Sequence, residues 1–153
     1  FEEKRYFRPG YHTSIFKTDV GRIGLIICYD VYFPEVSRLL SVKGANVIVC
    51  ISASPSVRRG FFETLTAARA MENSVFLAFV NLAGIEDGLQ FWGGSRIIAP
   101  SGSVITQAKY DADDFIHAKI NYSDISRVQA WVPTLRDLRP EIFTSLKEET
   151  ENL

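Results

Sequence analysis

Residues 24–35 read GLIICYDVYFPE and combine three features in one short stretch. An apolar run ends at Cys28, a polar turn follows, and Pro34 suits the first turn of a helix. This order predicts a buried strand that stops at a cysteine and leads into a helix. A thiol at the end of such a strand lies near main-chain N–H groups that can stabilise a thiolate or an oxyanion. Cys28 is therefore a candidate nucleophile, with an apolar core residue as the alternative.

The pattern continues on both sides of this stretch as alternating strands and helices. The expected elements are a hairpin of strands 14–18 and 22–28, helix 33–43, strand 46–51, helix 60–73 and strand 74–81. Such alternation predicts parallel strands joined by crossover helices, and hence the α/β fold class.

The second half of the chain is less regular. We expect a polar loop at 83–94, a hairpin of strands 95–99 and 104–107, a strand at 113–120, a short helix at 122–130 and an irregular tail at 131–153. The length of 153 residues fits a single domain.

Residues 24–35 resemble the cysteine signature of the nitrilase superfamily of carbon–nitrogen hydrolases, G-hydrophobic-C-Y-D-x-x-F-P-E. Four further motifs are similar to that family in order and spacing: Arg69–Asn73, Asn81–Gly84, Gly93–Gly102 and Arg136–Phe143. The resemblance covers residues 1–143 and leaves a charged tail at 144–153. It implies part of an αββα four-layer sandwich that is incomplete without an N-terminal half.

The resemblance also implies a catalytic set. Members of the family attack a C–N carbon with a thiolate, form a covalent acyl intermediate and release ammonia. Cys28 matches the nucleophile, and Glu3 matches a second glutamate that many members place near thiol and substrate; a flexible terminal carboxylate is the alternative. The main-chain N–H of Tyr29 resembles the oxyanion donor. Asn81 is a candidate pocket residue, with a loop cap as an equal alternative.

Two members of the family's catalytic set are expected to be missing. The family's lysine and its principal glutamate lie upstream of the segment that FEE at residues 1–3 resembles. Lys4 follows Glu3, whereas the motif lysine precedes it, so Lys4 reads as a solvated charge. We expect a fragment, a cleavage product or a split protein with a separate N-terminal half. Residues 1–153 alone should be inactive and poorly soluble unless they pair or self-associate.

Other polar residues carry weaker expectations. Arg69 and Glu72 are expected to form structural pairs, and Cys50 is expected to pack inside an apolar strand. Tyr32 stands where many relatives have arginine, which puts the role of that arginine in doubt here.

Composition limits the possible partners. The net charge of −1 and the pI of about 6.2 give no electrostatic reason to expect nucleic acid or an anionic membrane as a partner. His12 and His117 lack metal-ligand spacing, and we expect neither a metal nor another cofactor. Two cysteines in apolar contexts favour a reducing cytoplasm over a disulfide framework.

Three functional interpretations stay open. The first is thiol-dependent hydrolysis of a non-peptide C–N bond, in a small amide or an N-carbamoyl compound. The second is a non-catalytic fragment or degenerate homologue that acts as an assembly module. A third and weaker one is a Cys/His hydrolase with His12 or His117 as base. The expected partners are a small amide-type substrate and, from the resemblance, a homodimer or higher oligomer with 60–73 and 131–143 at the interface.

Overall fold

The computed structural model describes residues 3–152, so Phe1 and Glu2 of the FEE segment, like Leu153, lie outside the described residues. Six strands form one sheet in the order β1 (Ile15–Thr18), β2 (Gly21–Ile27), β3 (Val47–Ser52), β4 (Phe76–Asn81), β7 (Arg96–Ile98) and β8 (Val104–Gln107). β2, β3 and β4 run parallel, and the other three pairs are antiparallel. The expected parallel centre and its two flanking hairpins are confirmed.

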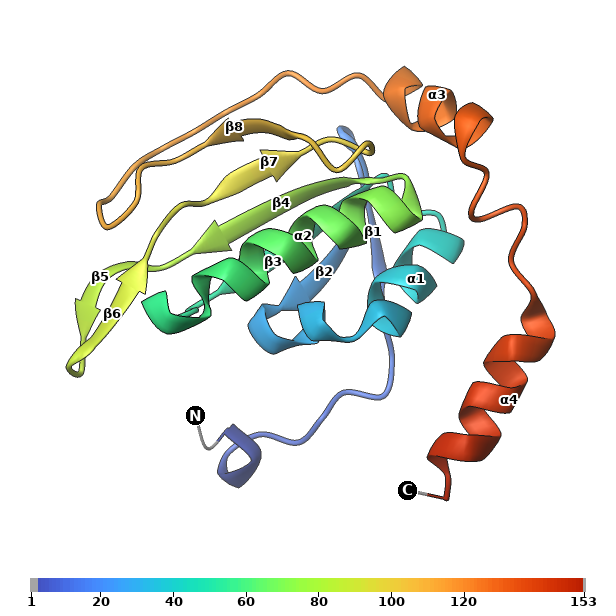
Figure 1. Ribbon diagram of the computed structural model, residues 1–153, viewed down its shortest axis with the longest axis horizontal. Helices are drawn as coiled ribbons and strands as arrows, with labels where there is room; N and C mark the ends of the chain where they lie inside the picture. The colour runs from blue at the N-terminus through green and yellow to red at the C-terminus, as the bar shows by residue number, and fades with distance from the viewer. Residues whose placement is uncertain (1–2, 153) are drawn as a thin grey trace.

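Two helices cover one face of this sheet, as Figure 1 shows: α1 (Pro34–Val42) and α2 (Arg59–Asn73). α1 begins at Pro34, and its end is followed by Gly44 with φ of +94°, the left-handed conformation that glycine adopts at little cost. The core between sheet and helices holds fully buried side chains from both layers: Ile26, Leu40, Ile48, Cys50, Phe62, Leu77 and Phe79. The α/β fold class and the packing of Cys50 are both confirmed.

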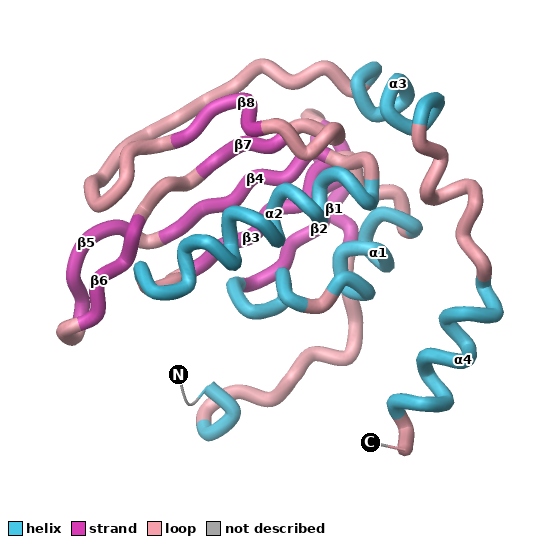
Figure 2. Tube along the Cα trace, viewed as in Figure 1, coloured by secondary structure: helices cyan, strands magenta, loops and turns pink. Residues whose placement is uncertain are grey.

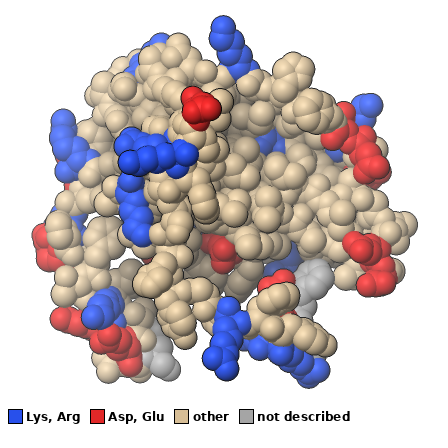
Figure 3. Space-filling model, turned by 180° about the vertical axis from the view of Figure 1, so that it is seen from behind, with Lys and Arg blue, Asp and Glu red and all other residues tan. Residues whose placement is uncertain are grey.

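Within residues 3–152, no helix covers the opposite face of the sheet in this way. Strand register places two rows of apolar residues on it: Leu25, Val49, Ala78 and Ile97 in one row, and Ile27, Ile51 and Val80 in the next. Leu25, Ile27, Ile51 and Val80, which we call the open face, are 42–56% exposed. Figure 3 views the molecule from this side and shows a broad area without charged side chains, with most charges toward the rim. One covered and one open face are what half of a four-layer sandwich would present.

Residues 83–94 form a second hairpin, so the expectation of a loop there was wrong. β5 (Ala83–Glu86) and β6 (Leu89–Trp92) pair antiparallel around Asp87 and Gly88, which both have positive φ. An Asp-Gly pair between two short strand segments is a strong signal for a hairpin, because it fits the tight turn that the twist of the strands favours.

The strand expected at 113–120 is absent from the described chain. The Asp114 carboxylate accepts hydrogen bonds from the main-chain N–H groups of Lys109 and Phe115, both at 2.9 Å. A short acidic side chain that binds nearby main-chain N–H groups competes with strand pairing. The segment is therefore irregular, and Phe115 stays exposed.

The last part of the chain is helical rather than irregular. The expected helix is present as α3 (Ser123–Trp131), and α4 (Pro140–Thr150) follows it. Figure 2 shows α4 as an arm apart from the sheet. Pro140 in the first turn, Glu141 near the N-terminus and Lys147 near the C-terminus all favour this helix. None of the described helices is long and apolar enough to cross a membrane.

Candidate active site

Cys28 lies at a sharp elbow between β2 and a short 3-10 helix, η2 (Cys28–Tyr32). Its φ is +44°, in a region that residues other than glycine rarely occupy. The Ile27 main-chain N–H donates to Asp30 Oδ2 at 2.9 Å and ties the two ends of the elbow together. Backbone strain of this kind persists where surrounding contacts fix it, and it concentrates at functional sites. The elbow leaves the Cys28 side chain half-buried.

A buried arginine of α2 holds the far end of the elbow. Arg69 Nε donates to the Val31 carbonyl at 2.9 Å, and Nη2 donates to the Tyr32 carbonyl at 3.1 Å. Its Nη1 pairs with Glu72 Oε1 at 3.1 Å, so the expected structural pair is confirmed. The carbonyls at the end of a helix have no partners within the helix, and Arg69 donates hydrogen bonds to two of them. Through this contact α2 sets the position of η2.

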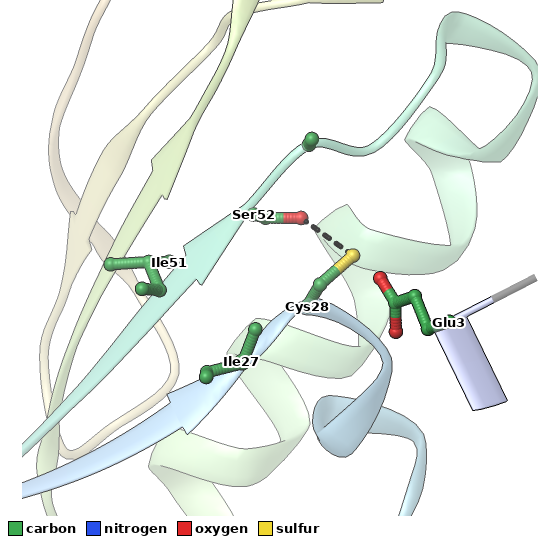
Figure 4. Close-up of a pocket in the computed structure, with 6 residues that line it drawn as sticks. Glu3, Ile27, Cys28, Ile51 and Ser52 are labelled. Atoms are coloured by element: carbon green, nitrogen blue, oxygen red, sulfur yellow. Dashed lines mark hydrogen bonds between the residues drawn. The ribbon is translucent and has the colours of Figure 1, made fainter. Parts of the chain in front are cut away.

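A pocket of about 330 Å³ opens beside the thiol, with Glu3, Ile27, Cys28, Ile51, Ser52 and Ala53 around it. Figure 4 shows the Glu3 carboxylate turned toward Cys28, so the structure brings these two predicted site residues together. The pocket lies at the carboxyl ends of the parallel strands β2 and β3, where α/β folds place their ligands. Ile27 and Ile51 belong to the open face, so the pocket reaches that face.

Ser52 is a pocket residue that the sequence did not single out. Its hydroxyl donates a hydrogen bond to Cys28 Sγ at 3.2 Å, drawn as a dashed line in Figure 4. The strand expected at 46–51 ends one residue before Ser52, whereas β3 extends through it. The sequence signal that could have identified Ser52 was its position at the carboxyl end of the strand next to β2.

The two cysteines lie in different environments. Cys50 is fully buried, and this burial is the main cause that raises the pKa of its thiol to about 12. At neutral pH Cys50 is therefore protonated and closed to solvent. Cys28 is the half-buried thiol and lines a pocket.

The Asn81 side chain is occupied by main-chain groups. Its Nδ2 donates to the carbonyls of Gly93 and Ser54 at 3.1 and 3.4 Å, and its Oδ1 accepts from the Ser54 N–H at 2.8 Å. Asn81 is not among the residues that line the Cys28 pocket. These contacts favour the loop-cap alternative, and they fix the segment that follows Ser52. Contact of Asn81 with substrate stays a prediction.

Aromatic packing surrounds the outer side of the elbow. The Tyr29 ring, which is partly exposed, lies 5.1 Å from the Tyr32 ring and 5.3 Å from the Phe33 ring. Tyr32 also packs edge-on against Phe62 of α2 at 5.6 Å. Tyr32 thus takes part in an aromatic cluster, at the position where the family resemblance would lead us to expect arginine. The main-chain N–H of Tyr29 lies in the first turn of η2, and its role as oxyanion donor stays a prediction.

No group of three or more His, Cys, Asp or Glu side chains between residues 3 and 152 is placed to hold a metal ion.

Comparison with protein families and curated relatives agrees with this geometry. The family model for carbon-nitrogen hydrolases matches residues 1–130. A probable nitrilase of Schizosaccharomyces pombe is 30% identical over 145 residues, which are 94% of this chain and 53% of that protein. A 2-oxoglutaramate amidase of Bacillus subtilis is 31% identical over 142 residues, 93% of this chain and 54% of that protein. The chain therefore spans about half the length of these relatives.

Solved structures give the same result. A carbon-nitrogen hydrolase from Helicobacter pylori superposes with a TM-score of 0.88 at 28% identity, over 94% of this chain and 55% of that one. A mutant of the amidase from Nesterenkonia sp. AN1 gives a TM-score of 0.76 at 28% identity, over 94% and 51% of the two chains. That structure shows covalent addition of the acetamide moiety of fluoroacetamide at its active-site cysteine.

Proposed function

The chain belongs to the carbon–nitrogen hydrolase family, and we propose that it supplies the nucleophilic thiol of an amidase. One observation carries the proposal: the half-buried Cys28 sits on a strained elbow, in a pocket, with Ser52 and Glu3 beside it. The other thiol, Cys50, is closed inside the core. The cysteine adduct in the Nesterenkonia amidase supports the assignment by similarity.

The proposed reaction proceeds in two covalent steps. The Cys28 thiolate attacks the amide carbon, a C–S bond forms, and the carbonyl electron pair moves onto oxygen, next to the Tyr29 main-chain N–H. Collapse of this intermediate breaks the C–N bond, and the nitrogen takes up a proton and leaves as ammonia. Water then attacks the thioester, which releases a carboxylic acid and restores the thiol.

Glu3 is proposed as a second carboxylate that faces the reacting group. Its placement beside the Cys28 pocket lets it accept a hydrogen bond from the substrate amide N–H. We assign the general base and the lysine to a segment outside residues 1–153, as the family resemblance implies. The share of about 53–55% of each relative that this chain spans is compatible with a separate or preceding half.

The substrate class is proposed to be a small amide rather than an N-carbamoyl compound. Relatives that are 31% identical to this chain include a 2-oxoglutaramate amidase of Bacillus subtilis and an omega-amidase of Xenopus tropicalis. A pocket of about 330 Å³ lies at the lower end of the range for small-molecule sites and would suit a compact substrate.

Self-association is proposed through the outer side of α2. A shallow hollow of about 410 Å³ is lined by Val57, Gly60, Phe61, Thr64 and Leu65. Val57 and Phe61 are exposed there, and Trp131 is exposed at the end of α3. Exposed large apolar side chains that cluster in a hollow mark association surfaces. These segments agree with the interface that the family resemblance implies.

Ammonia release from the complete protein tests the proposed function. With 2-oxoglutaramate as substrate we expect turnover that Cys28→Ala abolishes and the matched control Cys50→Ala retains. An N-carbamoyl amine, assayed in parallel, separates the two substrate classes. A folded complete protein that releases no ammonia from either compound would contradict the enzyme and leave the assembly module as the function.

A further inference from the structure

The hydrogen bond between Ser52 and Cys28 identifies a further catalytic residue. We infer that the Ser52 hydroxyl stabilises the Cys28 thiolate and so assists its attack on the substrate. The inference rests on the proposed role of Cys28 and adds a group that none of the family-like motifs contains. Ser52 touches the reacting atom directly, because its Oγ lies 3.2 Å from Sγ.

The position of Ser52 is fixed by strand pairing on both sides. Ile51 pairs with Ile27, the last residue of β2, and this pairing brings the residues that follow them, Ser52 and Cys28, together at the carboxyl ends of the strands. On the other side Ser52 pairs with Asn81, and its carbonyl accepts a hydrogen bond from the Leu82 N–H at 3.0 Å. A hydroxyl held by rigid strands is preorganised, so it loses little entropy when it binds the sulfur.

The chemistry of the two groups decides which one donates. A thiolate has no proton and can only accept, so the Ser52 hydroxyl must be the donor once Cys28 ionises. Hydrogen bonds to ionised groups are stronger than neutral ones. An ionised Glu3 carboxylate can only accept and cannot stabilise a neighbouring thiolate. Ser52 thus supplies a donor that the other polar side chain at the pocket lacks.

Stabilisation of a thiolate has two opposite effects on rate. A thiol that ionises more easily supplies more thiolate, but each tenfold gain in acidity lowers its intrinsic nucleophilicity by only about 0.4–0.5 log units. When most of the thiol is still protonated, the gain in thiolate exceeds the loss in nucleophilicity. A charge-assisted hydrogen bond of ordinary strength therefore speeds reaction of the thiol about three- to tenfold at neutral pH.

Alkylation by iodoacetamide tests this inference without any substrate. In the complete protein at pH 7, Ser52→Ala should slow modification of Cys28 about three- to tenfold, read as adduct on the Cys28 peptide by mass spectrometry. Ser54→Ala is the matched control, since its buried hydroxyl has no hydrogen-bond partner among the described residues. It should alkylate at the wild-type rate.

A pair of variants of equal shape removes the effect of packing. Ser52→Thr keeps the hydroxyl and should stay within about twofold of wild type, whereas Ser52→Val lacks it and should be as slow as Ser52→Ala. Equal alkylation rates for Ser52→Thr and Ser52→Val, or faster alkylation of either Ser52→Ala or Ser52→Val than of wild type, would overturn the inference.

Amide turnover is measured in a separate assay. Slow alkylation of Ser52→Val in a protein without amidase activity would sink the proposed function and leave the role of Ser52 intact.

Discussion

Burial separates the two thiols at the scale of single residues. Cys50 lies in the core between Ile26 and Phe79 of the neighbouring strands, and burial is the main reason why the pKa of its thiol rises to about 12. Cys28 faces a pocket and has a neighbouring hydroxyl donor. The same residue type thus serves packing at one position and is available for chemistry at the other.

Removal of the Cys28 thiol should stop catalysis without unfolding the protein. Cys28→Ala should lower kcat of the complete enzyme at least about 10³-fold, because no covalent intermediate can form. Steady-state ammonia release, together with a thermal unfolding curve close to that of wild type, checks this. Near-normal turnover would show that another group performs the attack.

Removal of the Cys50 thiol should do the reverse. Cys50→Ala leaves a small cavity in the core and should lower the free energy of unfolding by about 1–2 kcal/mol. Denaturant unfolding measures this change. The rate at which iodoacetamide modifies Cys28 serves as the control and should not change. A variant that keeps its stability but loses reactivity would mean that the two thiols act together.

The sequence allowed only part of the site to be predicted. Cys28 and Glu3 were predicted because a linear motif marks them, and the structure brings both to one pocket. Ser52 was missed because its position beside the thiol depends on how far two neighbouring strands extend, which no local pattern records. Asn81 was predicted as a pocket residue or a loop cap, and its side chain caps main-chain groups.

At the scale of elements, the contact between α2 and η2 supports the elbow. Arg69→Met keeps most of the side-chain length but removes the hydrogen bonds to Val31 and Tyr32. The free energy of unfolding should fall by about 2–4 kcal/mol, because two carbonyls and the Glu72 carboxylate lose a buried partner. Alkylation of Cys28 should also slow, since a displaced thiol loses the contact with Ser52.

An exposed arginine provides the matched control for this substitution. Arg136 pairs with Asp137 at the surface, where ion pairs contribute little. Arg136→Met should therefore change the free energy of unfolding by less than about 0.5 kcal/mol. Equal effects at the two positions would show that Arg69 contributes nothing specific to the elbow.

A second polar cluster ties α2 to β7 and makes stability depend on pH. Burial alone would raise the pKa of Glu63, but hydrogen bonds from Arg96 at 2.8 Å, Tyr110 at 2.7 Å and Arg59 at 3.2 Å lower it overall. A depressed folded-state pKa stabilises the protein above the unfolded value of about 4.3, and this contribution is lost as the pH falls through the folded value.

Substitution of Glu63 should remove the part of the pH dependence of stability that this carboxylate causes. Glu63→Gln should be less stable than wild type at pH 7, and the difference should shrink as the pH falls from about 5 to 3. Denaturant unfolding at several pH values gives this comparison. A constant difference across that range would show that the Glu63 charge does not contribute.

The helices and strands were predictable where the sequence pattern fits only one type of secondary structure. The parallel strands and α1 and α2 follow from continuous apolar runs that alternate with helical spacing. The hairpin at β5 and β6 was missed although Asp87-Gly88 marks it. The expected strand at 113–120 failed because Asp114 takes the main-chain N–H groups that a strand would use. α4 was missed although Pro140 and its charges favour a helix there.

At the scale of the whole molecule, the open face is the main feature that lacks a packing partner among the described residues. Leu25, Ile27, Ile51 and Val80 are apolar side chains that no described element covers. Residues 1–153 expressed alone should self-associate, as light scattering would detect, because a large exposed apolar face favours association. Leu25→Lys combined with Val80→Lys should reduce that association. A monomeric chain that releases ammonia from amides would contradict both the open face and the incomplete catalytic set.

Capture of the covalent intermediate would show which residue attacks the amide carbon. The complete protein is mixed with a small amide, quenched in acid within one turnover and digested for mass spectrometry. We expect an acyl group, attached as a thioester, on the peptide that contains Cys28, and none on Cys50. The adduct should be lost on treatment with hydroxylamine. Amide turnover without an acyl adduct at Cys28, or with an adduct at a different residue, would contradict the claim that Cys28 is the nucleophile.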